Sequence, residues 1–336
     1  MLIRVEVTLK ESYNITFSKI GIALNKYKDK RLFLITDENV YFYYKNHLKE
    51  TLKEYNVDYI IIKPGEKSKS EEKYLKIIHE LLEKHITRKD IIVAFGGGVV
   101  GDLSGFVAAT ILRGVSFINI PTSLLAMVDS SIGSKVGIDT HYGKNLLGAF
   151  KNPLEVIIDF NYLKTLPKEE YNNGIAEVIK YYLIDDVSLL EDIKNNNLEN
   201  IIKKSIKSKK EIITKDPFET YERMYLNFGH TFAHAIERHS NYEIPHGYAV
   251  AMGMDISIRL GIYFNITNKE VLNKLHNLYS YYDLPLFKGN IQELVPYLSS
   301  DKKAHADKIN FVFIKDVGTP YIKQIEKEVF YEISSF

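Results

Sequence analysis

The strongest constraint on the fold is a repeated alternation of short β-branched runs with amphipathic stretches in the first half of the chain. Five such runs are typical of buried strands, and they lie at residues 31–36, 58–63, 90–95, 116–121 and 155–160. Between the second and third run, apolar side chains recur at helical spacing along a charged segment, at Tyr74, Leu75, Ile78, Leu81 and Leu82. Repeated strand–helix–strand units predict a parallel sheet covered by helices.

After about residue 160 the pattern changes to long helical stretches. We expect helices at residues 168–184, 187–214, 222–240, 246–263 and 267–282. A later run, INFVFIKDVG, indicates one more strand. The sequence therefore predicts an α/β nucleotide-binding domain over residues 1–160 and a mostly α-helical domain over residues 161–336.

Composition narrows the class of protein. The 336 residues include 44 Lys and Arg against 43 Asp and Glu, a net charge of +1, which argues against a nucleic-acid or anionic-membrane binder. The chain has no cysteine, so disulfides, thiolate metal sites and cysteine nucleophiles are excluded. We expect a cytoplasmic protein, because no apolar run approaches the roughly 20 residues of a membrane span and the N-terminus lacks a signal-peptide core.

The segment DIIVAFGGGVVGDLSG combines a strand that ends at Phe95, a glycine-rich turn and a helix that is expected to run from about Asp102 to Gly114. Backbone N–H groups at such a turn can bind a pyrophosphate. The match to a dinucleotide fingerprint is weak, since the acidic residue expected about 20 positions later is missing. Tight packing of the helix on its strand is the alternative explanation of the glycines.

A second polar cluster lies in residues 121–150, which are too rich in Gly and Ser for a plain helix. Its polar members are Asp129, Lys135, Asp139, Lys144 and Asn145. Lysines beside glycines suit an anionic ligand, so we expect a polar site built from loops. A polar surface connection is the alternative, but it does not explain the apolar run at 124–128.

Four histidines fall within 17 residues, at positions 230, 234, 239 and 246. His230 and His234 are four apart on one helical face, and spacing alone favours them as the first pair of zinc ligands. Glu177 interrupts an apolar helix face and is the candidate carboxylate ligand, with Lys180 expected to point the same way. Hydrogen-bonded histidines without a metal are the alternative.

Seven motifs, in this order and spacing, resemble those of 3-dehydroquinate synthases, members of the sugar phosphate cyclase superfamily. They are GGGVVGDLSGFVAATILRG, PTSLLAMVDSSIGSK, GKNLLGAF, TLP, GIAEVIK, LNFGHTFAHAIE and HGYAVAMGM. The resemblance covers residues 31–303. It implies a lyase of the shikimate pathway, on the route to chorismate and aromatic amino acids. Such an enzyme converts 3-deoxy-D-arabino-heptulosonate 7-phosphate to 3-dehydroquinate and phosphate, using NAD+ and Zn2+, or alternatively Co2+.

The resemblance also implies roles for individual residues. It places metal and substrate in the helical domain and makes Glu177, His230 and His246 the metal ligands, which leaves His234 for proton transfer. The implied cofactor contacts are Glu66, Lys69, Gly97, Gly98, Val99, Val100, Gly101, Asp102, Thr122, Ser123, Lys135, Lys144 and Thr165. The implied substrate contacts are Arg113, Asp129, Lys135, Lys144, Asn145, Lys180, Lys209, Arg223, Asn227, His234 and Lys302. Four of these are expected to act in catalysis, namely His234, Lys180, Asn145 and Lys135.

Arg113 matches an arginine that reaches a neighbouring subunit's site in the family, which implies a homodimer acting on a small sugar phosphate. The chain departs from the family pattern at Ser134, Tyr248 and Pro217–Phe218. The implied chemistry is transient oxidation, phosphate elimination, re-reduction and intramolecular aldol closure. The alternatives are a cyclase that forms 2-deoxy-scyllo-inosose, aminodehydroquinate or a valiolone, and a metal-dependent polyol dehydrogenase.

Overall fold

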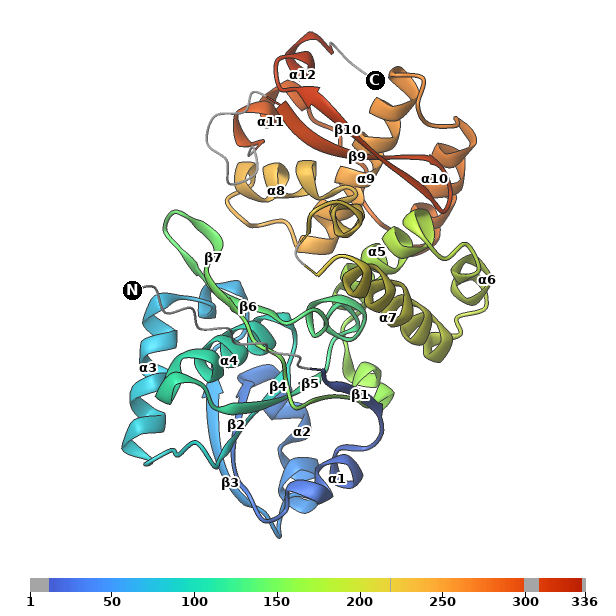
Figure 1. Cartoon of the computed structure of the whole chain (residues 1–336). Coiled ribbons are helices and arrows are strands. Elements are labelled where there is room, and N and C mark those ends of the chain that lie inside the picture. The colour runs from blue at the N-terminus through green and yellow to red at the C-terminus, as the bar shows by residue number, and fades with distance from the viewer. Residues whose placement is uncertain (1–11, 218, 299–307, 334–336) are drawn as a thin grey trace, which may run out of the picture. The chain divides into compact units, whose positions relative to one another are not determined.

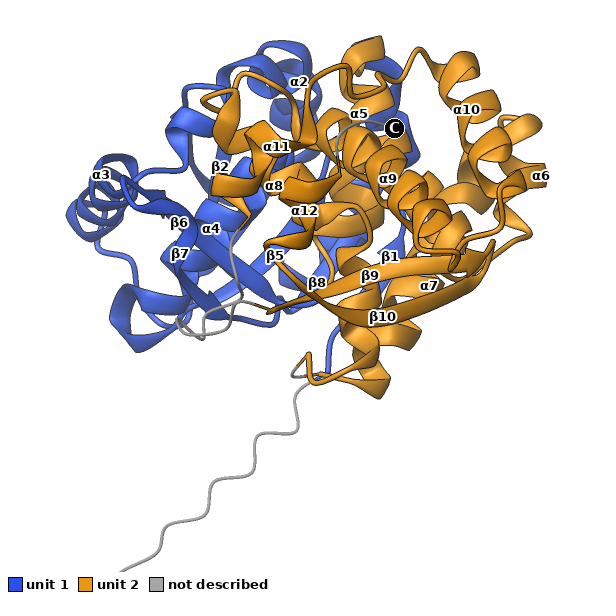
Figure 2. Ribbon diagram, turned by 90° about the horizontal axis from the view of Figure 1, so that it is seen from above, with its two compact units in different colours: residues 1–122, 133–165 blue, residues 123–132, 166–336 orange. Residues whose placement is uncertain are grey.

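The computed structural model describes residues 12–217, 219–298 and 308–333. The chain forms two compact units, residues 1–122 with 133–165 and residues 123–132 with 166–336 (Figure 2). The first contains a parallel sheet and the second is mostly helical, which confirms the predicted fold class. The predicted domain boundary at residue 160 stays a prediction.

The first unit is built on a six-stranded parallel sheet (Figure 1). In spatial order its strands are β1 (Asn14–Phe17), β8 (Glu155–Ile158), β5 (Ser116–Pro121), β4 (Ile91–Gly96), β2 (Arg31–Asp37) and β3 (Asn56–Ile62). All five predicted runs are strands of this sheet, whereas β1 was not predicted. β4 is buried throughout, as expected for a central strand with both faces covered.

The helices of the first unit follow the strands in alternation. They are α1 (Ile20–Ala23), α2 (Glu38–Thr51), α3 (Glu71–Glu83) and α4 (Gly98–Thr110), with short 3-10 turns η1 (Leu24–Tyr27), η2 (Glu66–Ser68), η3 (Ile111–Arg113) and η5 (Phe160–Thr165). α3 buries Ile77 and Leu81, but Leu75 and Leu82 are exposed, so the expected apolar face was wrong at these two positions. The buried face follows the 3.6-residue period rather than every apolar residue.

The chain passes from β2 outward to β3 and then returns to β4 on the opposite side of β2. The carboxyl ends of β2 and β4 therefore flank a topological switch point, where open α/β sheets bind ligands. The glycine-rich turn follows β4 directly at Gly97, and α4 starts at Gly98, earlier than expected. The fold thus places the predicted pyrophosphate-binding turn at the switch point of the sheet.

Residues 123–150 form regular secondary structure where the sequence predicted a site built from loops. They form a π-helical turn η4 (Ala126–Ser130) and an antiparallel hairpin of β6 (Lys135–Thr140) and β7 (Gly143–Phe150). The hairpin strands approach closely at Gly137 and Gly148, where an added Cβ would lie 2.8 Å from a carbonyl oxygen of the opposite strand. The glycines thus serve strand pairing, which a count of loop-forming residues does not reveal.

The second unit is mostly helical. Its elements are α5 (Lys168–Ile184), α6 (Leu189–Lys194), α7 (Leu198–Lys215), η6 (Glu222–Asn227), α8 (His230–His239), α9 (His246–Tyr263), α10 (Glu270–Tyr282), α11 (Ile291–Leu294), η7 (Val295–Tyr297), β9 (Lys308–Asp316), β10 (Thr319–Glu326) and α12 (Val329–Glu332). The predicted strand is β9, and it pairs with β10. Two predicted helices are interrupted, at Asn196 and at Gly229, because both residues have a left-handed backbone, with φ of 51° and 80°.

Helices α8 and α9 are in direct backbone contact. A Cβ added at Gly253 of α9 would lie 2.1 Å from the carbonyl oxygen of Gly229, the residue that precedes α8. A side chain at position 253 therefore cannot fit without separating the two helices. Because α8 starts at His230 and α9 starts at His246, this contact sets the distance between two predicted metal ligands.

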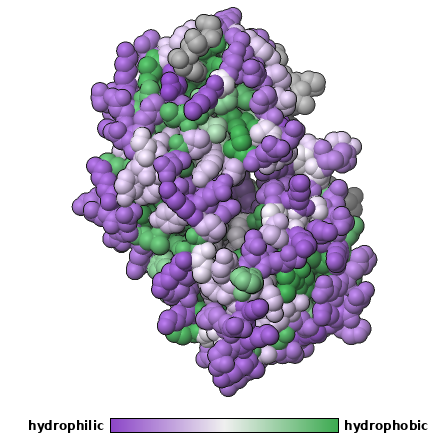
Figure 3. Space-filling view, turned by 180° about the vertical axis from the view of Figure 1, so that it is seen from behind, coloured by the Kyte–Doolittle hydropathy of each residue, from purple (hydrophilic) through white to green (hydrophobic). Residues whose placement is uncertain are grey.

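Hydrophilic side chains cover much of the face shown in Figure 3, and hydrophobic ones form separate patches on it. Across the described parts of the chain, none of the helices combines the length and the hydropathy needed to span a bilayer.

Ser134 supplies a test of how the chain accommodates a residue other than glycine on a left-handed backbone. Its backbone is left-handed, with φ of 63°, and its hydroxyl hydrogen-bonds the Asn152 side chain. A left-handed backbone costs a non-glycine residue about 1–2 kcal/mol, and a neutral hydrogen bond returns about 1 kcal/mol. We expect Ser134→Gly to be as stable as wild type or up to about 1 kcal/mol more stable, because relief of the left-handed strain offsets the lost hydrogen bond. Ser134→Ala keeps the strain and should lose about 1 kcal/mol, as measured by urea denaturation. An alanine variant as stable as the glycine variant would contradict this account.

Candidate active site

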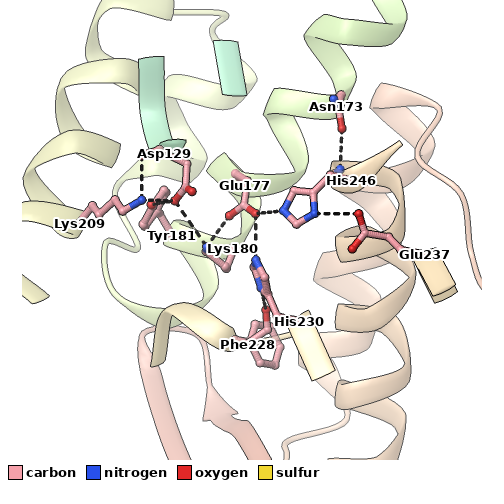
Figure 4. Close-up of polar contacts among 11 residues, drawn as sticks. Asp129, Asn173, Glu177, Lys180, Tyr181, Lys209, Phe228, His230, Glu237 and His246 are labelled. Atoms are coloured by element: carbon pink, nitrogen blue, oxygen red, sulfur yellow. Dashed lines mark hydrogen bonds and ion pairs between the residues drawn. The ribbon is translucent and has the colours of Figure 1, made fainter. Parts of the chain in front are cut away.

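Three side chains of the second unit converge on one point. Glu177 Oε1 lies 3.4 Å from His230 Nε2 and 3.5 Å from His246 Nε2, and ligand atoms of all three lie within 4.8 Å of one another (Figure 4). Ligands at the usual distances from a tetrahedral zinc lie about 3.3 Å apart. The geometry and the donor set, one carboxylate and two imidazoles, both fit a catalytic zinc site with an open position.

The two imidazole rings are oriented by their second nitrogen atoms. His230 Nδ1 lies 3.2 Å from the Phe228 carbonyl oxygen, and His246 Nδ1 lies 3.4 Å from Glu237 Oε1. Each contact directs Nε2 of its ring towards Glu177, as outer partners of metal-binding histidines do. Glu237 is buried, and sequence reasoning did not select it, although it lies within one of the quoted motifs.

Glu177 is fully buried and its charge is balanced by neighbours. Burial raises the pKa of its carboxyl, but Lys180 and His230 more than offset this and hold the pKa well below its usual value. Both carboxylate oxygens make ion-pair contacts, yet neither accepts a hydrogen bond of good geometry from a described donor. A buried carboxylate in this state can accept a cation as a further partner.

His246 responds to the same charges. Burial lowers the pKa of its imidazole, whereas the close carboxylates of Glu177 and Glu237 raise it to about 10. Metal binding at Nε2 requires the neutral ring, so it displaces this proton.

A second charged group surrounds Asp129. Its Oδ1 accepts a hydrogen bond from the Tyr181 hydroxyl at 2.5 Å and lies 2.9 Å from Lys209 Nζ and 3.8 Å from Lys180 Nζ. Burial raises the pKa of the Asp129 carboxyl, but the two lysines lower it to about 2. Lys180 also pairs with Glu177, so it joins this group to the three converging side chains. Sequence reasoning missed Tyr181, which lies among apolar residues of a buried helix.

His234 lies one helical turn after His230, and their ring centroids are 5.6 Å apart. Desolvation by the surrounding chain lowers the pKa of the His234 imidazole to about 3, and the neighbouring His230 lowers it further. Part of the residue is nevertheless exposed to solvent. The structure groups His230 with His246 rather than with His234, unlike the pairing favoured by spacing alone. A helical interval of four residues identifies a shared face, whereas the three converging side chains come from three different helices, α5, α8 and α9.

Arg223 and Asn227 lie on a segment organised by Asp216. The Asp216 carboxylate accepts the backbone N–H groups of Thr220, Tyr221 and Arg223, at 2.9, 2.7 and 3.1 Å. Two more contacts fix the segment: the Arg223 guanidinium donates to the Pro217 carbonyl oxygen, and the Asn227 amide donates to Glu219 Oε1 at 2.7 Å.

The predicted cofactor contacts of the first unit gather around the glycine-rich turn. The first turn of α4 leaves the N–H groups of residues 98–100 without intrahelical partners, which suits an anion. The buried Lys69 ammonium donates to Asp102 Oδ2 at 2.6 Å and lies 3.9 Å from Glu66 Oε1. Thr122 follows β5, and its N–H donates to the Gly96 carbonyl oxygen at 2.9 Å.

The remaining predicted residues have the following places. Lys135 starts β6, Lys144 and Asn145 lie in β7, Thr165 ends η5, and Arg113 is exposed at the end of η3. Ser123 belongs to the second unit, where its hydroxyl accepts the Ala126 N–H at 3.3 Å. Lys302 lies outside the described residues.

The structure adds one candidate cofactor contact, Asp37. It ends β2 at the switch point, and its carboxylate accepts the Val40 N–H at 3.0 Å as the N-cap of α2. A carboxylate at such a position suits the hydroxyls of a nucleotide ribose. Sequence reasoning missed it because the usual pattern places the acid after the glycine-rich turn, whereas Asp37 precedes that turn by about 60 residues.

The metal assignment predicts different outcomes for three histidine substitutions. His246→Ala removes a ligand and should reduce the metal of dialysed protein to about a tenth or less of one ion per chain. His234→Ala should keep the metal and lower turnover by about 10²–10⁴-fold, the usual contribution of a proton-transfer group. His239→Ala, an exposed position on the same helix, is the control and should change neither. Equal metal content in wild type and His246→Ala would falsify the assignment, as measured by elemental analysis.

The hydrogen bonds of Asp216 predict that its carboxylate stabilises the fold in a pH-dependent way. Its backbone hydrogen bonds lower the folded-state pKa below the ordinary 3.8, so the contribution is present above pH 3.8 and is lost as the pH falls further. We expect Asp216→Asn to be less stable than wild type at pH 7 and the difference in unfolding free energy to shrink below pH 4. A difference that stays constant between pH 7 and pH 3 would contradict this prediction.

Comparisons with known proteins agree with this arrangement. Residues 59–173 match the family model described as 3-dehydroquinate synthase N-terminal, and residues 174–304 match 3-dehydroquinate synthase C-terminal. A 3-dehydroquinate synthase of Clostridium acetobutylicum is 41% identical over 96% of each chain.

Two solved structures share the fold. One is 2-deoxy-scyllo-inosose synthase complexed with carbaglucose-6-phosphate, NAD+ and Co2+, with a TM-score of 0.85, 23% identity and 96% of each chain covered. The other is 2-epi-5-epi-valiolone synthase from Streptomyces hygroscopicus with NAD+ and Zn2+ bound, with a TM-score of 0.88, 22% identity and 98% of each chain covered. The two matching models together span most of the sequence, and the chain therefore belongs to the 3-dehydroquinate synthase family.

Proposed function

We propose that this protein is a 3-dehydroquinate synthase, which converts 3-deoxy-D-arabino-heptulosonate 7-phosphate to 3-dehydroquinate and phosphate. The observation that carries the proposal is the convergence of Glu177, His230 and His246 beside the partly buried Asp129–Lys209 pair, in a chain of this family. The three ligands suit a metal that binds hydroxyls, and the lysines suit an anionic substrate.

We propose NAD+ and Zn2+ as cofactors, with Co2+ as an alternative metal, because related cyclases of the same fold hold these groups. Bound metal polarises a hydroxyl group, and bound NAD+ accepts and returns a hydride. Glu177, His230 and His246 would hold the metal. The glycine-rich turn and the first turn of α4 would bind the pyrophosphate, with Asp37 and the Lys69–Asp102 pair beside it.

The chain's own residues would divide the remaining tasks. His234 is a nitrogen base one turn from His230, and it would exchange a proton with a substrate held beside that cluster. Lys180 and Lys209 hold Asp129 ionised, which lets it accept hydrogen bonds from substrate hydroxyls. The further proposed substrate contacts are Arg113, Lys135, Lys144, Asn145, Arg223, Asn227 and Lys302.

Arg223 favours this substrate over those of other sugar phosphate cyclases. Its buried guanidinium donates to the Pro217 carbonyl oxygen, which fixes the position of a planar cation. An arginine in this setting suits the planar carboxylate of the heptulosonate, which glucose phosphate lacks. The 41% identity to a 3-dehydroquinate synthase favours the same choice, whereas the 2-deoxy-scyllo-inosose synthase shares the fold at 23% identity.

We also propose a homodimer in the cytoplasm, in which Arg113 reaches the neighbouring subunit's site. Leu112 and Arg113 are both left-handed, with φ of 51° and 65°, and the Leu112 carbonyl oxygen accepts from Arg88 Nε at 2.8 Å. Two strained residues held in this way present Arg113 at the surface, which supports a function for the turn.

The decisive experiment supplies the heptulosonate phosphate, NAD+ and Zn2+ to the purified protein. We expect release of inorganic phosphate, formation of dehydroquinate and no net NADH, because the hydride returns to the product in each turnover. Stoichiometric NADH formed from a simple polyol would instead identify a dehydrogenase. Phosphate release from glucose 6-phosphate, but not from the heptulosonate, would identify another cyclase.

A further inference from the structure

Asp139 connects two segments of the first unit that carry predicted site residues. Its backbone N–H donates to the Lys69 carbonyl oxygen at 2.8 Å, and Ser70 and Asp139 form an isolated parallel bridge. Its side-chain Oδ1 accepts the Asn145 backbone N–H at 2.8 Å. One residue therefore joins the segment of Lys69 to the strand that carries Asn145.

The local backbone indicates why this connection is needed. The β6–β7 register shifts between Ile138 and Thr140, so Asp139 lies at the irregular position of the hairpin. Such irregularities turn a side chain out of the regular alternation. Asn145 is left-handed, with φ of 55°, and its side chain is exposed. The Asp139 carboxylate holds this unfavourable backbone through a charge-assisted hydrogen bond.

We propose that Asp139 is a positioning residue for the proposed reaction, which holds Asn145 and the adjacent Lys144 in a fixed place relative to Lys69. The inference rests on the proposed function, since Lys69 and Lys144 are proposed cofactor contacts and Asn145 is a proposed substrate contact. Asp139 itself touches neither NAD+ nor the substrate. It acts through the backbone of the residues that contact them.

The charges around Asp139 come from three elements. Lys69 and Glu66 face it from the segment before α3, Lys144 of β7 lies 3.7 Å from Glu66 Oε1, and Asp102 of α4 pairs with Lys69. Burial, with a further contribution from Glu66, raises the pKa of Asp139 to about 6 against the opposing effects of Lys69 and the Asn145 N–H. The carboxylate is therefore ionised at neutral pH and takes up a proton as the pH falls through 6.

This titration predicts the direction in which activity and NAD+ affinity change with pH. The hydrogen bond to Asn145 is stronger when Asp139 is ionised, so positioning is complete above pH 6 and weakens below it. In the wild type we expect kcat/KM and the NAD+ affinity to fall as the pH decreases through about 6. Asp139→Asn keeps an acceptor oxygen but cannot ionise, so it should lose this acid limb.

The test compares Asp139→Asn with Asp90→Asn in the full-length, metal-loaded protein. Asp90 is a matched control, because its Oδ2 also accepts a backbone N–H, that of Thr87 at 2.7 Å, at an exposed site outside the proposed machinery. We expect Asp139→Asn to reduce the protection of the Asn145 amide against hydrogen exchange by about tenfold. The dissociation constant of NAD+ and the KM of the heptulosonate phosphate should each rise by about tenfold, while Asp90→Asn matches wild type.

A second measurement needs no substitution. In the wild type, the protection factor of the Asn145 amide should fall between pH 7 and pH 5, while that of the Thr87 amide stays level.

Asp139→Glu keeps a carboxylate and should recover part of the NAD+ affinity and the acid limb. The inference is overturned if Asp139→Asn equals Asp90→Asn in NAD+ affinity, KM and pH profile, whatever happens to its melting temperature.

Failure of the proposed function has a different signature. A wild type that binds NAD+ but releases no phosphate would overturn the proposed function. The positioning role would then be judged on NAD+ affinity and on Asn145 protection, neither of which requires turnover. Unchanged values of both in Asp139→Asn would overturn the inference on its own.

Discussion

The second unit depends on a continuous series of buried and partly buried charges of alternating sign. Lys209, Asp129, Lys180 and Glu177 follow one another in direct contact, and His246 and Glu237 continue the series to the next helix. An isolated charge in this interior would be costly, and removing one member would leave its neighbours uncompensated. The same contacts lower the pKa of the Asp129 and Glu177 carboxyls and raise the pKa of Lys180, which favours the charged state needed to bind a cation and an anionic substrate. Stability and function therefore use the same atoms.

The proposed cofactor site of the first unit depends on exposed backbone N–H groups more than on buried charges. The parallel sheet ends its central strands at one edge, and the glycine-rich turn presents the first N–H groups of α4 there. The Lys69–Asp102 pair is fixed beside this turn by burial of the lysine. Rigid elements thus carry the turn, while the β6–β7 hairpin, with its left-handed Ser134 and Asn145, carries polar side chains on strained backbone.

Much of the fold was predictable, because it follows from local periodicity. The five predicted runs are strands in the structure, and the amphipathic stretch before Asp90 is α3. These elements were predictable because a segment with one buried face repeats its apolar residues along its whole length. The breaks at Asn196 and Gly229 were not predictable from apolar spacing, because a single left-handed residue ends a helix without changing the pattern around it. Spacing selected His230 correctly as a member of the cluster but paired it with His234, since the position of His246 depends on how α8 and α9 pack. Tyr181 acts through a contact with the distant Asp129, which no local pattern contains. Glu237 contacts His246 on the next helix, and Asp216 accepts backbone N–H groups of a non-helical segment that follows it, so apolar periodicity selects neither residue.

The contact between Gly229 and Gly253 has a consequence for how members of such families are recognised. Neither glycine has a side chain that could bind a metal, yet their close approach decides whether two imidazoles can share one ion. A relative could retain every ligand and still be inactive after a change as small as one methyl group at position 253. Conversely, exchanging one ligand type for another could be tolerated while the helices stay in register. An inventory of ligands is therefore an incomplete criterion for telling active family members from degenerate copies, and the spacer glycines belong in that comparison.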